Sequence, residues 1–450
     1  MRRKIEDKLL EWKLNNNGRT AVLIDGARRV GKSYIVEKFA EENYKSYILI
    51  DFNEVGSEIK ELFDVNLRDL DSFFMYLSAA YNTKLYDRES LIIFDEVQLY
   101  PRARAAIKYL VADGRYDYIE TGSLMSIKKN VKDILIPSEE RHIKMFPMDF
   151  EEFLWAKGED LIMPVIRDCF EKRKQLGQAL HRKVLTLFRE YVIVGGMPQA
   201  VEEYIETRDF ESVDLIKRDI LTLYRADIQK YAEGYEGKTE SIFDEIPAQL
   251  SKHEKRFTLS SLEKGARFRN YESAFLWLQD SMITNVCFNS TEPNIGLKMN
   301  RDNSSFKIYM ADTGLLISHA FDEAGIVSED IYKKLLFGKL EVNEGMIFEN
   351  IVAQMLAANG RSLYFYSNPS RNDKESRMEI DFLLAKSKTT TRHNIIPLEV
   401  KSGKRYTLSS LKKFQNKYAE QLSEAIVLHT DDVKEQDGIK FLPVYMTCCL

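Results

Sequence analysis

The chain has 450 residues, of which 44% are hydrophobic and 30% are charged, and its net charge is −5. This length accommodates about two to four globular domains, and the net charge excludes a global basic field. Any contact with nucleic acid therefore has to come from local patches. No apolar run is long enough to span a bilayer, and the basic N-terminus does not lead into an apolar signal core. We expect a cytoplasmic protein with no membrane partner.

The first motif follows an apolar run that begins at Val22 and predicts a strand. Gly-x-x-x-x-Gly-Lys-Ser comes next, and a helix is predicted from about Tyr34, which is the context that a phosphate-binding P-loop requires. The glycines let backbone N–H groups turn inward around a phosphate, and the helix N-terminus adds positive charge. A chance glycine loop is the alternative, which this context disfavours. The predicted nucleotide-binding residues are Gly26, Ala27, Arg28, Arg29, Val30, Gly31, Lys32, Ser33 and Tyr34.

Chemical roles within this loop follow from the residue types. Lys32 is expected to reach the β- and γ-phosphates of a nucleotide, and the hydroxyl of Ser33 is expected to ligate Mg²⁺. A P-loop also needs an acid for the metal, and the short apolar run 91–94 ends in one. Asp95 is predicted to hold Mg²⁺ through water, and Glu96 to orient and polarise the attacking water. Without the P-loop, this acidic pair would be interpreted as a solvated loop.

Residues 116–123 predict a further strand that ends in small polar residues. Thr121 or Ser123 is a candidate to hydrogen-bond the γ-phosphate or the attacking water, and a cap on the next helix is an equal alternative. Strands that alternate with helices predict a parallel sheet covered on both faces. Because ligands bind at the carboxyl ends of such strands, one site can hold all of these residues. The sequence therefore predicts an α/β nucleotide-binding core.

Three later segments carry further motifs: FPMDFEEF over 146–153, VGGMP over 194–198 and KIYMADTGL over 307–315. With the P-loop, the acidic pair and the Thr121–Ser123 segment, they resemble the archaeal-type AAA+ ATPases of bacteria and archaea. The resemblance implies ATP and Mg²⁺ as cofactors, a sensor 1 role for Thr121 or Ser123, and self-association through the ATPase domain. Arg141 is a candidate arginine finger, although a surface ion pair is the stronger interpretation. Arg218 or Arg225 could reach back to the nucleotide, and nothing in the sequence selects either.

The middle of the chain predicts helices over 241–250, 259–263 and 271–281, followed by a strand over 283–289. Three helices followed by strands resemble a winged helix, in which one helix can enter the major groove of DNA. Residues 251–270 carry six basic and two acidic residues, a net charge of +4 with histidine neutral. This stretch is a candidate phosphate-binding patch and predicts DNA as a partner. The alternative is a solvated charged face of a domain used for protein contacts.

A second chemical pattern lies near the C-terminus. Glu349 falls near the apolar face of a helix predicted over 344–352, and Asp381 falls at the centre of a strand predicted over 378–384. Glu399 and Lys401 share one face of a third element, because strand side chains repeat every two residues. Asp381 followed by Glu399-x-Lys401 resembles the PD-(D/E)xK nuclease fold, with Glu379 and Ile380 where the name of the fold has proline.

The nuclease resemblance implies that Asp381 and Glu399 ligate Mg²⁺ and that Glu349 orients a ligand or completes the metal site. Lys401 would polarise the attacking water or stabilise charge on the phosphate, and the metal would supply Lewis acidity. The alternative is a retained nuclease-like fold in which these residues form a buried ion pair.

We therefore predict an α/β protein with four domains: a P-loop ATPase core over 1–150, a helical lid over 151–235, a winged-helix-like domain over 236–325 and a restriction-nuclease-like α/β domain over 326–450. The leading hypothesis is an ATP hydrolase that binds DNA and couples its nucleotide state to a Mg²⁺-dependent nuclease. The main rival is an ATP-switched regulator that binds DNA or protein, with a silent nuclease-like domain. Remodelling of a protein partner is a third hypothesis.

Overall fold

The computed structural model describes residues 1–122, 138–252, 255–294, 296–321, 329–339, 344–369, 373, 376–386, 394–403 and 405–450. It contains two compact units. The first comprises Met1–Phe146 with Asp280–Met282, and the second comprises Pro147–Gln279 with Ile283–Leu450. Within the described residues, no helix combines the length and the apolar character needed to cross a membrane.

The first unit is built on a five-stranded parallel sheet with the strand order β2-β3-β4-β1-β5. Its strands are β1 Ala21–Asp25, β2 Ser46–Asp51, β3 Ser90–Asp95, β4 Asp117–Gly122 and β5 Glu140–Lys144. Every residue of β1, β3 and β4 is buried, which explains their continuous apolar sequences. Because β1 lies between β4 and β5, the loop after β1 opens at the carboxyl edge beside the end of β4, and the end of β3 lies one strand further along.

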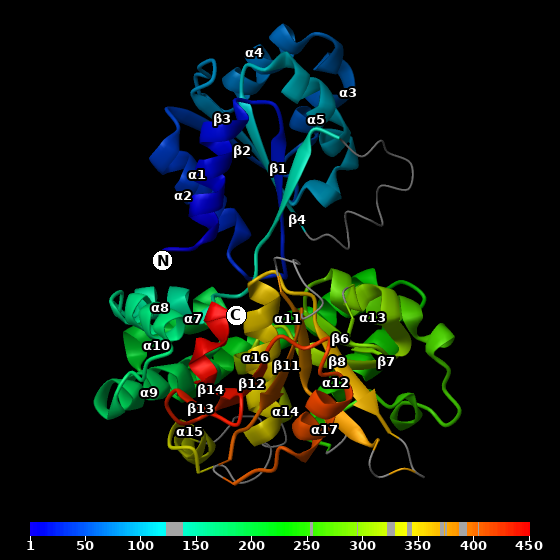
Figure 1. Ribbon diagram of the computed structural model, residues 1–450. Helices are drawn as coiled ribbons and strands as arrows, with labels where there is room; N and C mark the ends of the chain where they lie inside the picture. The colour runs from blue at the N-terminus through cyan, green and yellow to red at the C-terminus, as the bar shows by residue number, and fades with distance from the viewer. Residues whose placement is uncertain are drawn as a thin grey trace. The chain divides into compact units, whose positions relative to one another are not determined.

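Helices cover both faces of this sheet, with α1 and α2 on one side and α3, α4 and α5 on the other (Figure 1). Their bounds are α1 Ile5–Asn16, α2 Lys32–Asn43, α3 Ser57–Val65, α4 Leu70–Ala80 and α5 Pro101–Asp113. Aromatic rings concentrate under α3 and α4, where Phe63 contacts Phe52, Phe73 and Phe94 edge-on. The predicted α/β class is confirmed.

The second unit combines helices with two sheets. Its helices are α7 Phe150–Ala156, α8 Ile162–Lys172, α9 Gln178–Val194, α10 Pro198–Thr207, α11 Phe210–Tyr231, α12 Glu236–Ser251, α13 Glu272–Asp280, α14 Thr313–Ala320, α15 Glu329–Leu336, α16 Glu344–Ala358 and α17 Ser409–Lys417. One sheet has the order β7-β6-β8-β9 and the other β10-β11-β12-β14-β13. The strands are β6 Thr284–Ser290, β7 Arg301–Met310, β8 Tyr364–Asn368, β9 Met378–Ile380, β10 Phe382–Ala385, β11 Ile395–Val400, β12 Ala425–His429, β13 Lys434–Gln436 and β14 Ile439–Pro443.

The middle segment differs from its predicted pattern. Helix α12 begins at Glu236, five residues before the predicted start, and the predicted helix over 259–263 is a single 3-10 turn, η3 Leu259–Ser261. Strands β6 and β7 form an antiparallel pair, and β6 also pairs in parallel with β8. The middle segment therefore shares a sheet with the C-terminal segment, and the winged-helix interpretation and the four-domain division stay predictions.

The strand predicted over 378–384 is broken at Asp381. Strand β9 pairs with β8, whereas β10 pairs with β11, so the chain passes from one sheet to the other at this residue. The Asp381 carboxylate accepts a hydrogen bond from the backbone N–H of Val400 at 2.9 Å. An aspartate can take the place of a ladder partner in this way, whereas local alternation of apolar residues predicts one continuous strand.

The three later sequence motifs meet in the second unit. The backbone N–H of Gly196 donates to Asp312 at 2.6 Å, and the backbone N–H of Met148 donates to the carbonyl of Gly196 at the same distance. A Cβ atom on Gly196 would lie 2.1 Å from the carbonyl oxygen of Met148, and one on Gly314 would lie 2.5 Å from that of Val194. These close approaches require glycine, so the motifs have a structural role in packing α7, α9 and α14 together.

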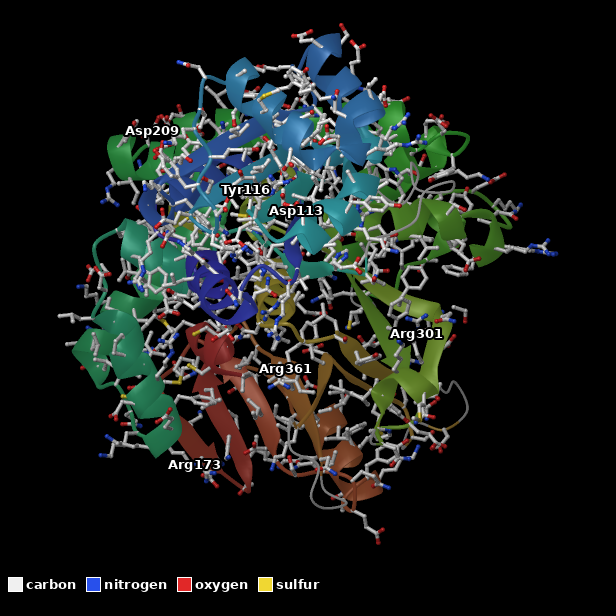
Figure 2. All side chains as sticks on the ribbon, turned by 90° about the horizontal axis from the view of Figure 1, so that it is seen from above. Asp113, Tyr116, Arg173, Asp209, Arg301 and Arg361 are labelled. Carbon is white, nitrogen blue, oxygen red and sulfur yellow. The ribbon has the colours of Figure 1, made fainter. Side chains whose placement is uncertain are left out.

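Arg361 ties the end of the chain to this unit (labelled in Figure 2). Its guanidinium donates to the carbonyl of Leu450 at 2.7 Å and to the carbonyl of Ala385 at 3.1 Å. The guanidinium has five N–H donors in a planar fork, so one arginine can satisfy carbonyls from two segments. The C-terminal residues are thereby fixed beside the end of β10.

Candidate nucleotide and metal sites

The P-loop connects β1 to α2 and has the backbone conformation that its glycines allow. Gly31 has φ 92° directly before α2 begins at Lys32, and Arg29 has φ 68°. A Cβ atom on Gly26 would lie 2.4 Å from the carbonyl oxygen of Met145, so this position also requires glycine. The loop ends at the N-terminus of α2, where free N–H groups and the helix dipole favour an anion.

Lys32 points into this loop. Its side chain is buried, and its ammonium donates to the carbonyls of Gly26 at 3.0 Å and Ala27 at 3.1 Å. Burial lowers the pKa of Lys32, and the nearby Glu96 and Asp95 oppose that shift. Neutral carbonyls are weaker acceptors for an ammonium group than a charged phosphate oxygen is. A phosphate bound in the loop would therefore take over the hydrogen bonds that Lys32 now donates to the carbonyls of Gly26 and Ala27.

Asp95, Glu96 and Thr121 lie at the ends of adjacent strands β3 and β4. The hydroxyl of Thr121 donates to the carboxylate of Asp95, and both residues are buried. Glu96 has φ 52° and ψ 42°, a left-handed conformation that is costly for a residue with a side chain. Its carboxylate accepts a hydrogen bond from the amide of Gln98, a residue that the motif did not single out. Strain of this kind concentrates at functional sites.

The other predicted nucleotide residues divide by exposure. Ala27 and Val30 are buried and support the loop, whereas the exposed residues are Arg28, Arg29, Ser33 and Tyr34. The Ser33 hydroxyl is therefore accessible to a ligand. Ser123 lies outside the described residues.

Three arginines were candidates to reach the nucleotide. Arg141 is exposed on β5, and its exposure distinguishes neither an arginine finger nor a surface ion pair. Arg218 donates to Asp214 at 2.7 Å, and Arg225 donates to Asp244 at 2.9 Å, so both guanidiniums have carboxylate partners within the second unit.

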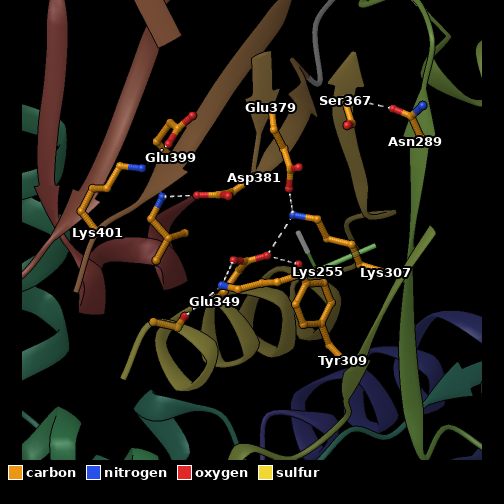
Figure 3. Close-up of polar contacts among 12 residues, drawn as sticks. Lys255, Asn289, Lys307, Tyr309, Glu349, Ser367, Glu379, Asp381, Glu399 and Lys401 are labelled. Atoms are coloured by element: carbon orange, nitrogen blue, oxygen red, sulfur yellow. Dashed lines mark hydrogen bonds and ion pairs between the residues drawn. The ribbon is translucent and has the colours of Figure 1, made fainter. Parts of the chain in front are cut away.

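The second group of candidate residues, near the C-terminus, centres on Glu349, which is buried in the middle of α16 (Figure 3). One carboxylate oxygen pairs with the ammonium of Lys255, and the other accepts hydrogen bonds from the hydroxyl of Tyr309 and from Lys307 at 3.1 Å. Lys307 also pairs with Glu379 at 2.9 Å. Burial alone would raise the pKa of Glu349, but the charges of Lys255 and Lys307 lower it to about 2.

Asp381, Glu399 and Lys401 lie next to Glu349, and these four residues are called the cluster below. The Lys401 ammonium is paired with one Glu399 oxygen, and the other Glu399 oxygen is buried with no hydrogen-bond partner among the described residues. Burial and the charge of Asp381 raise the pKa of Glu399 to about 8. Burial and the charge of Glu349 raise the pKa of Asp381. The structure therefore brings the predicted residues into one electrostatically coupled cluster.

The cluster does not fit a divalent cation in this arrangement. Among the described residues, no group of three or more histidine, cysteine or acidic side chains is placed to hold a metal ion. The oxygens of Glu349 already face two ammonium groups and a hydroxyl. Lys255, Lys307, Tyr309 and Glu379 had no predicted role at this site, although Lys307 and Tyr309 lie in the KIYMADTGL motif.

The basic stretch over 251–270 is mostly solvent-exposed. Lys252, Arg256, Lys264, Arg267 and Arg269 are exposed, whereas Lys255 is turned inward to Glu349. Arg267 precedes and Arg269 lies within the 3-10 turn η4 Phe268–Asn270. The exposed basic side chains of this stretch are therefore accessible to the phosphates of a nucleic acid.

Comparisons with known proteins divide the chain into three regions. Residues 18–154 match the AAA domain family, residues 185–324 match a domain of unknown function (DUF8612), and residues 344–447 match another domain of unknown function (DUF4143). No curated protein matches the chain.

Solved structures give remote matches. Drosophila ORC bound to DNA is 15% identical over 67% of this chain and 90% of that chain, with a TM-score of 0.27. Cdc6p from Pyrobaculum aerophilum is 10% identical over 75% of this chain and 93% of that chain, with a TM-score of 0.23. PCH-2 from C. elegans is 13% identical over 62% of this chain and 64% of that chain, with a TM-score of 0.19. These scores are too low to support a conclusion about either unit of this chain. The region that is similar to the AAA domain family contains the parallel sheet with its P-loop.

Proposed function

We propose that the chain binds and hydrolyses ATP at the carboxyl edge of the first sheet. One observation carries this proposal: Lys32, Asp95, Glu96 and Thr121 come from the loop or end of three adjacent parallel strands. Lys32 holds the outer phosphates, and the exposed Ser33 and the buried Asp95 would hold Mg²⁺ beside them. The metal would neutralise charge on the transferring phosphoryl group.

The protein's own residues would then position water. Glu96 accepts a proton from the attacking water, and Gln98 keeps the carboxylate in place through its amide. Thr121 holds the Asp95 carboxylate in place through its hydroxyl. Water adds to the γ-phosphorus, and the bond to the β,γ-bridging oxygen breaks, which releases ADP and phosphate.

The direct test is nucleotide binding and hydrolysis by the full chain. Lys32→Ala should weaken ATP binding, because the ammonium aimed into the loop is lost. Lys38→Ala is a matched control on the same helix, since Lys38 pairs with Glu6 outside the loop. If Lys32→Ala and wild type bind and hydrolyse ATP equally, the site is elsewhere.

For the second unit we propose DNA as the partner and phosphodiester hydrolysis as the reaction of the Asp381–Glu399–Lys401 cluster. Contacts within the cluster support this proposal, because Lys401 pairs with Glu399 and the nearby charge of Asp381 contributes to the raised pKa of Glu399. Lys401 would orient the water that adds to phosphorus as the P–O bond breaks.

The rival proposal is an ATP-switched binding protein with a silent nuclease-like region. The pairing of Glu349 with Lys255, Lys307 and Tyr309 favours it, because these groups satisfy the carboxylate without a metal. Cleavage of duplex, single-stranded and branched DNA with Mg²⁺ or Mn²⁺, with and without ATP, distinguishes the two proposals.

A further inference from the structure

Arg3 lies before α1, outside the region that matches the AAA domain family, and its side chain reaches the P-loop. Its guanidinium donates to the carbonyl of Val30 at 2.9 Å and to the carbonyl of Phe146 at 2.7 Å. The residue is 6% exposed, so its charge lies mostly out of water and needs such acceptors. A planar fork of N–H donors suits two carbonyls from different segments. Arg3 therefore links the P-loop to the segment that follows β5.

The supports on both sides of this link are themselves fixed. The carbonyl of Arg3 accepts a hydrogen bond from the backbone N–H of Glu6 at 3.1 Å, at the start of α1. Beyond β5, the backbone N–H of Met145 donates to the carbonyl of Asp25 at 2.8 Å, directly before the P-loop. The guanidinium thus holds the Val30 carbonyl from a helix on one side and from the end of a sheet strand on the other.

The direction of the Val30 carbonyl determines the direction of the Gly31 N–H group. The C=O and N–H groups of one trans peptide point to opposite sides of the chain. Because Arg3 holds the carbonyl, the N–H of Gly31 points away from Arg3. No carbonyl among the described residues accepts a hydrogen bond from this N–H group, which directly precedes α2. An oriented N–H group at a helix N-terminus favours an anion.

Gly31 does not fix this peptide group by itself. Glycine adopts positive and negative φ about equally well, so its φ of 92° needs support from elsewhere. If the peptide group rotated, the Val30 carbonyl oxygen would take the place of the Gly31 N–H and present a partial negative charge to a phosphate. The contact with Arg3 opposes that rotation.

We propose that Arg3 is a positioning residue that holds the Val30–Gly31 peptide group so that the Gly31 N–H faces the phosphates of the bound nucleotide. This inference rests on the proposed ATP site. The N–H groups of a P-loop surround the α- and β-phosphates. The effect of Arg3 should therefore be common to ATP and ADP.

The test is the affinity of the full chain for ATP and for ADP, together with steady-state ATP hydrolysis. Arg3→Met keeps the apolar stem and removes the donors. Affinity for ATP and for ADP should fall equally, by about tenfold or more, because a hydrogen bond to a charged group is lost. KM should rise while kcat stays within about twofold, because Asp95 and Glu96 are unchanged. Lys8→Met removes the same charge from the exposed side of α1 and should match wild type.

Three results would overturn this role of Arg3. Arg3→Met could bind ADP as tightly as wild type does. Lys8→Met could lose as much affinity as Arg3→Met, which would assign the effect to net charge. Arg3→Met could lower kcat and leave KM unchanged, which would show that the nucleotide phosphates are still bound as before.

A second measurement does not depend on nucleotide. Hydrogen–deuterium exchange of the P-loop, followed by mass spectrometry of a proteolytic fragment over 26–34, should be faster in Arg3→Met than in wild type. A fragment within α5 should exchange equally in the two proteins. Unchanged exchange of the loop would contradict the inference. Faster exchange of both fragments would also contradict it, because it would show a general loss of structure.

Failure of the ATP proposal is separable from failure of this inference. If wild type binds neither nucleotide but loop exchange rises only in Arg3→Met, Arg3 holds the loop and the ATP proposal is wrong. If Lys32→Ala abolishes ATP binding whereas Arg3→Met changes neither affinity nor loop exchange, the ATP site holds and the role of Arg3 is wrong.

Discussion

The ammonium of Lys307 lies 3.1 Å from a carboxylate oxygen of Glu349, and both side chains are buried. Lys307 falls in the region that matches one domain of unknown function, and Glu349 falls in the region that matches the other. Because an unpaired buried charge is costly, this ion pair couples the two regions energetically. It explains in part why they belong to one compact unit.

Loss of this pair should destabilise the second unit. Lys307→Met leaves the Glu349 and Glu379 carboxylates without their shared cation, and we expect a loss of about 3–5 kcal/mol in the free energy of unfolding. Adding Glu349→Gln should recover part of that loss, because less buried negative charge remains. Urea denaturation of both proteins and of Glu349→Gln alone measures this. Lys334→Met, in an exposed pair with Asp330, is the control. Strictly additive losses would show that the two residues are not coupled.

Glu96 should affect ATP hydrolysis more than ATP binding. Glu96→Gln removes the proposed base and keeps the shape of the side chain, so hydrolysis should slow by about a hundredfold or more while the affinity for ATP is retained. Gln98→Ala should have a smaller effect in the same direction, because Gln98 only positions Glu96. Phosphate release and nucleotide titration give the two quantities, and Glu89→Gln is an exposed control. Unchanged hydrolysis in Glu96→Gln would remove Glu96 from the mechanism.

Arg267 and Arg269 should contribute to DNA binding through phosphates. Replacing both by alanine should weaken binding about uniformly across sequences and should lower the slope of log affinity against log salt by about 2. Fluorescence anisotropy at several salt concentrations measures the slope. The same double change at Lys172 and Arg173, both exposed near the end of α8, controls for net charge. An unchanged slope would exclude the proposed contact.

Asp381 and Lys401 should affect cleavage of DNA without affecting ATP hydrolysis. Asp381→Ala and Lys401→Ala should each stop phosphodiester cleavage, because the first removes a carboxylate of the proposed cluster and the second removes the ammonium that would orient the attacking water. Neither should strongly change ATP hydrolysis, because the P-loop lies in the other unit. Plasmid cleavage and phosphate release on the same preparations measure the two activities. Cleavage that persists in Lys401→Ala would exclude the proposed role of the lysine.

Lys217 should make stability depend on pH in the alkaline range. Its ammonium donates to the carbonyl of Ile193 at 2.9 Å, and burial lowers its pKa from 10.5 to about 8. Between pH 8 and 10.5 the unfolded chain holds this proton more tightly than the folded chain, so the contribution of Lys217 to stability rises with pH. The difference in unfolding free energy between wild type and Lys217→Met should shift in favour of wild type from pH 8 to pH 10. A constant difference across this range would contradict the assignment.

The nucleotide site could be predicted from the sequence because its signals are local. The spacing of Gly26, Gly31 and Lys32 specifies the loop, and the rule that parallel strands end at one edge places Asp95 and Thr121 beside it. The carboxylates and the lysine of the second cluster could also be named, because alternation along a strand places Glu399 and Lys401 on one face. Gln98 carried no such signal, since its role depends on the left-handed backbone at Glu96.

Only the tertiary structure decided how the second cluster is neutralised. Local patterns predict which side chains of one element share a face, but they do not specify which distant residue meets a buried carboxylate. Lys255 and Lys307 come from an irregular segment and from β7, and both converge on α16. The break at Asp381 likewise arises because β9 and β10 pair in different sheets. The sequence determined which residues are candidates to bind phosphate and metal, and long-range packing determined that lysines already hold the Glu349 carboxylate, because burial of its charge requires a partner.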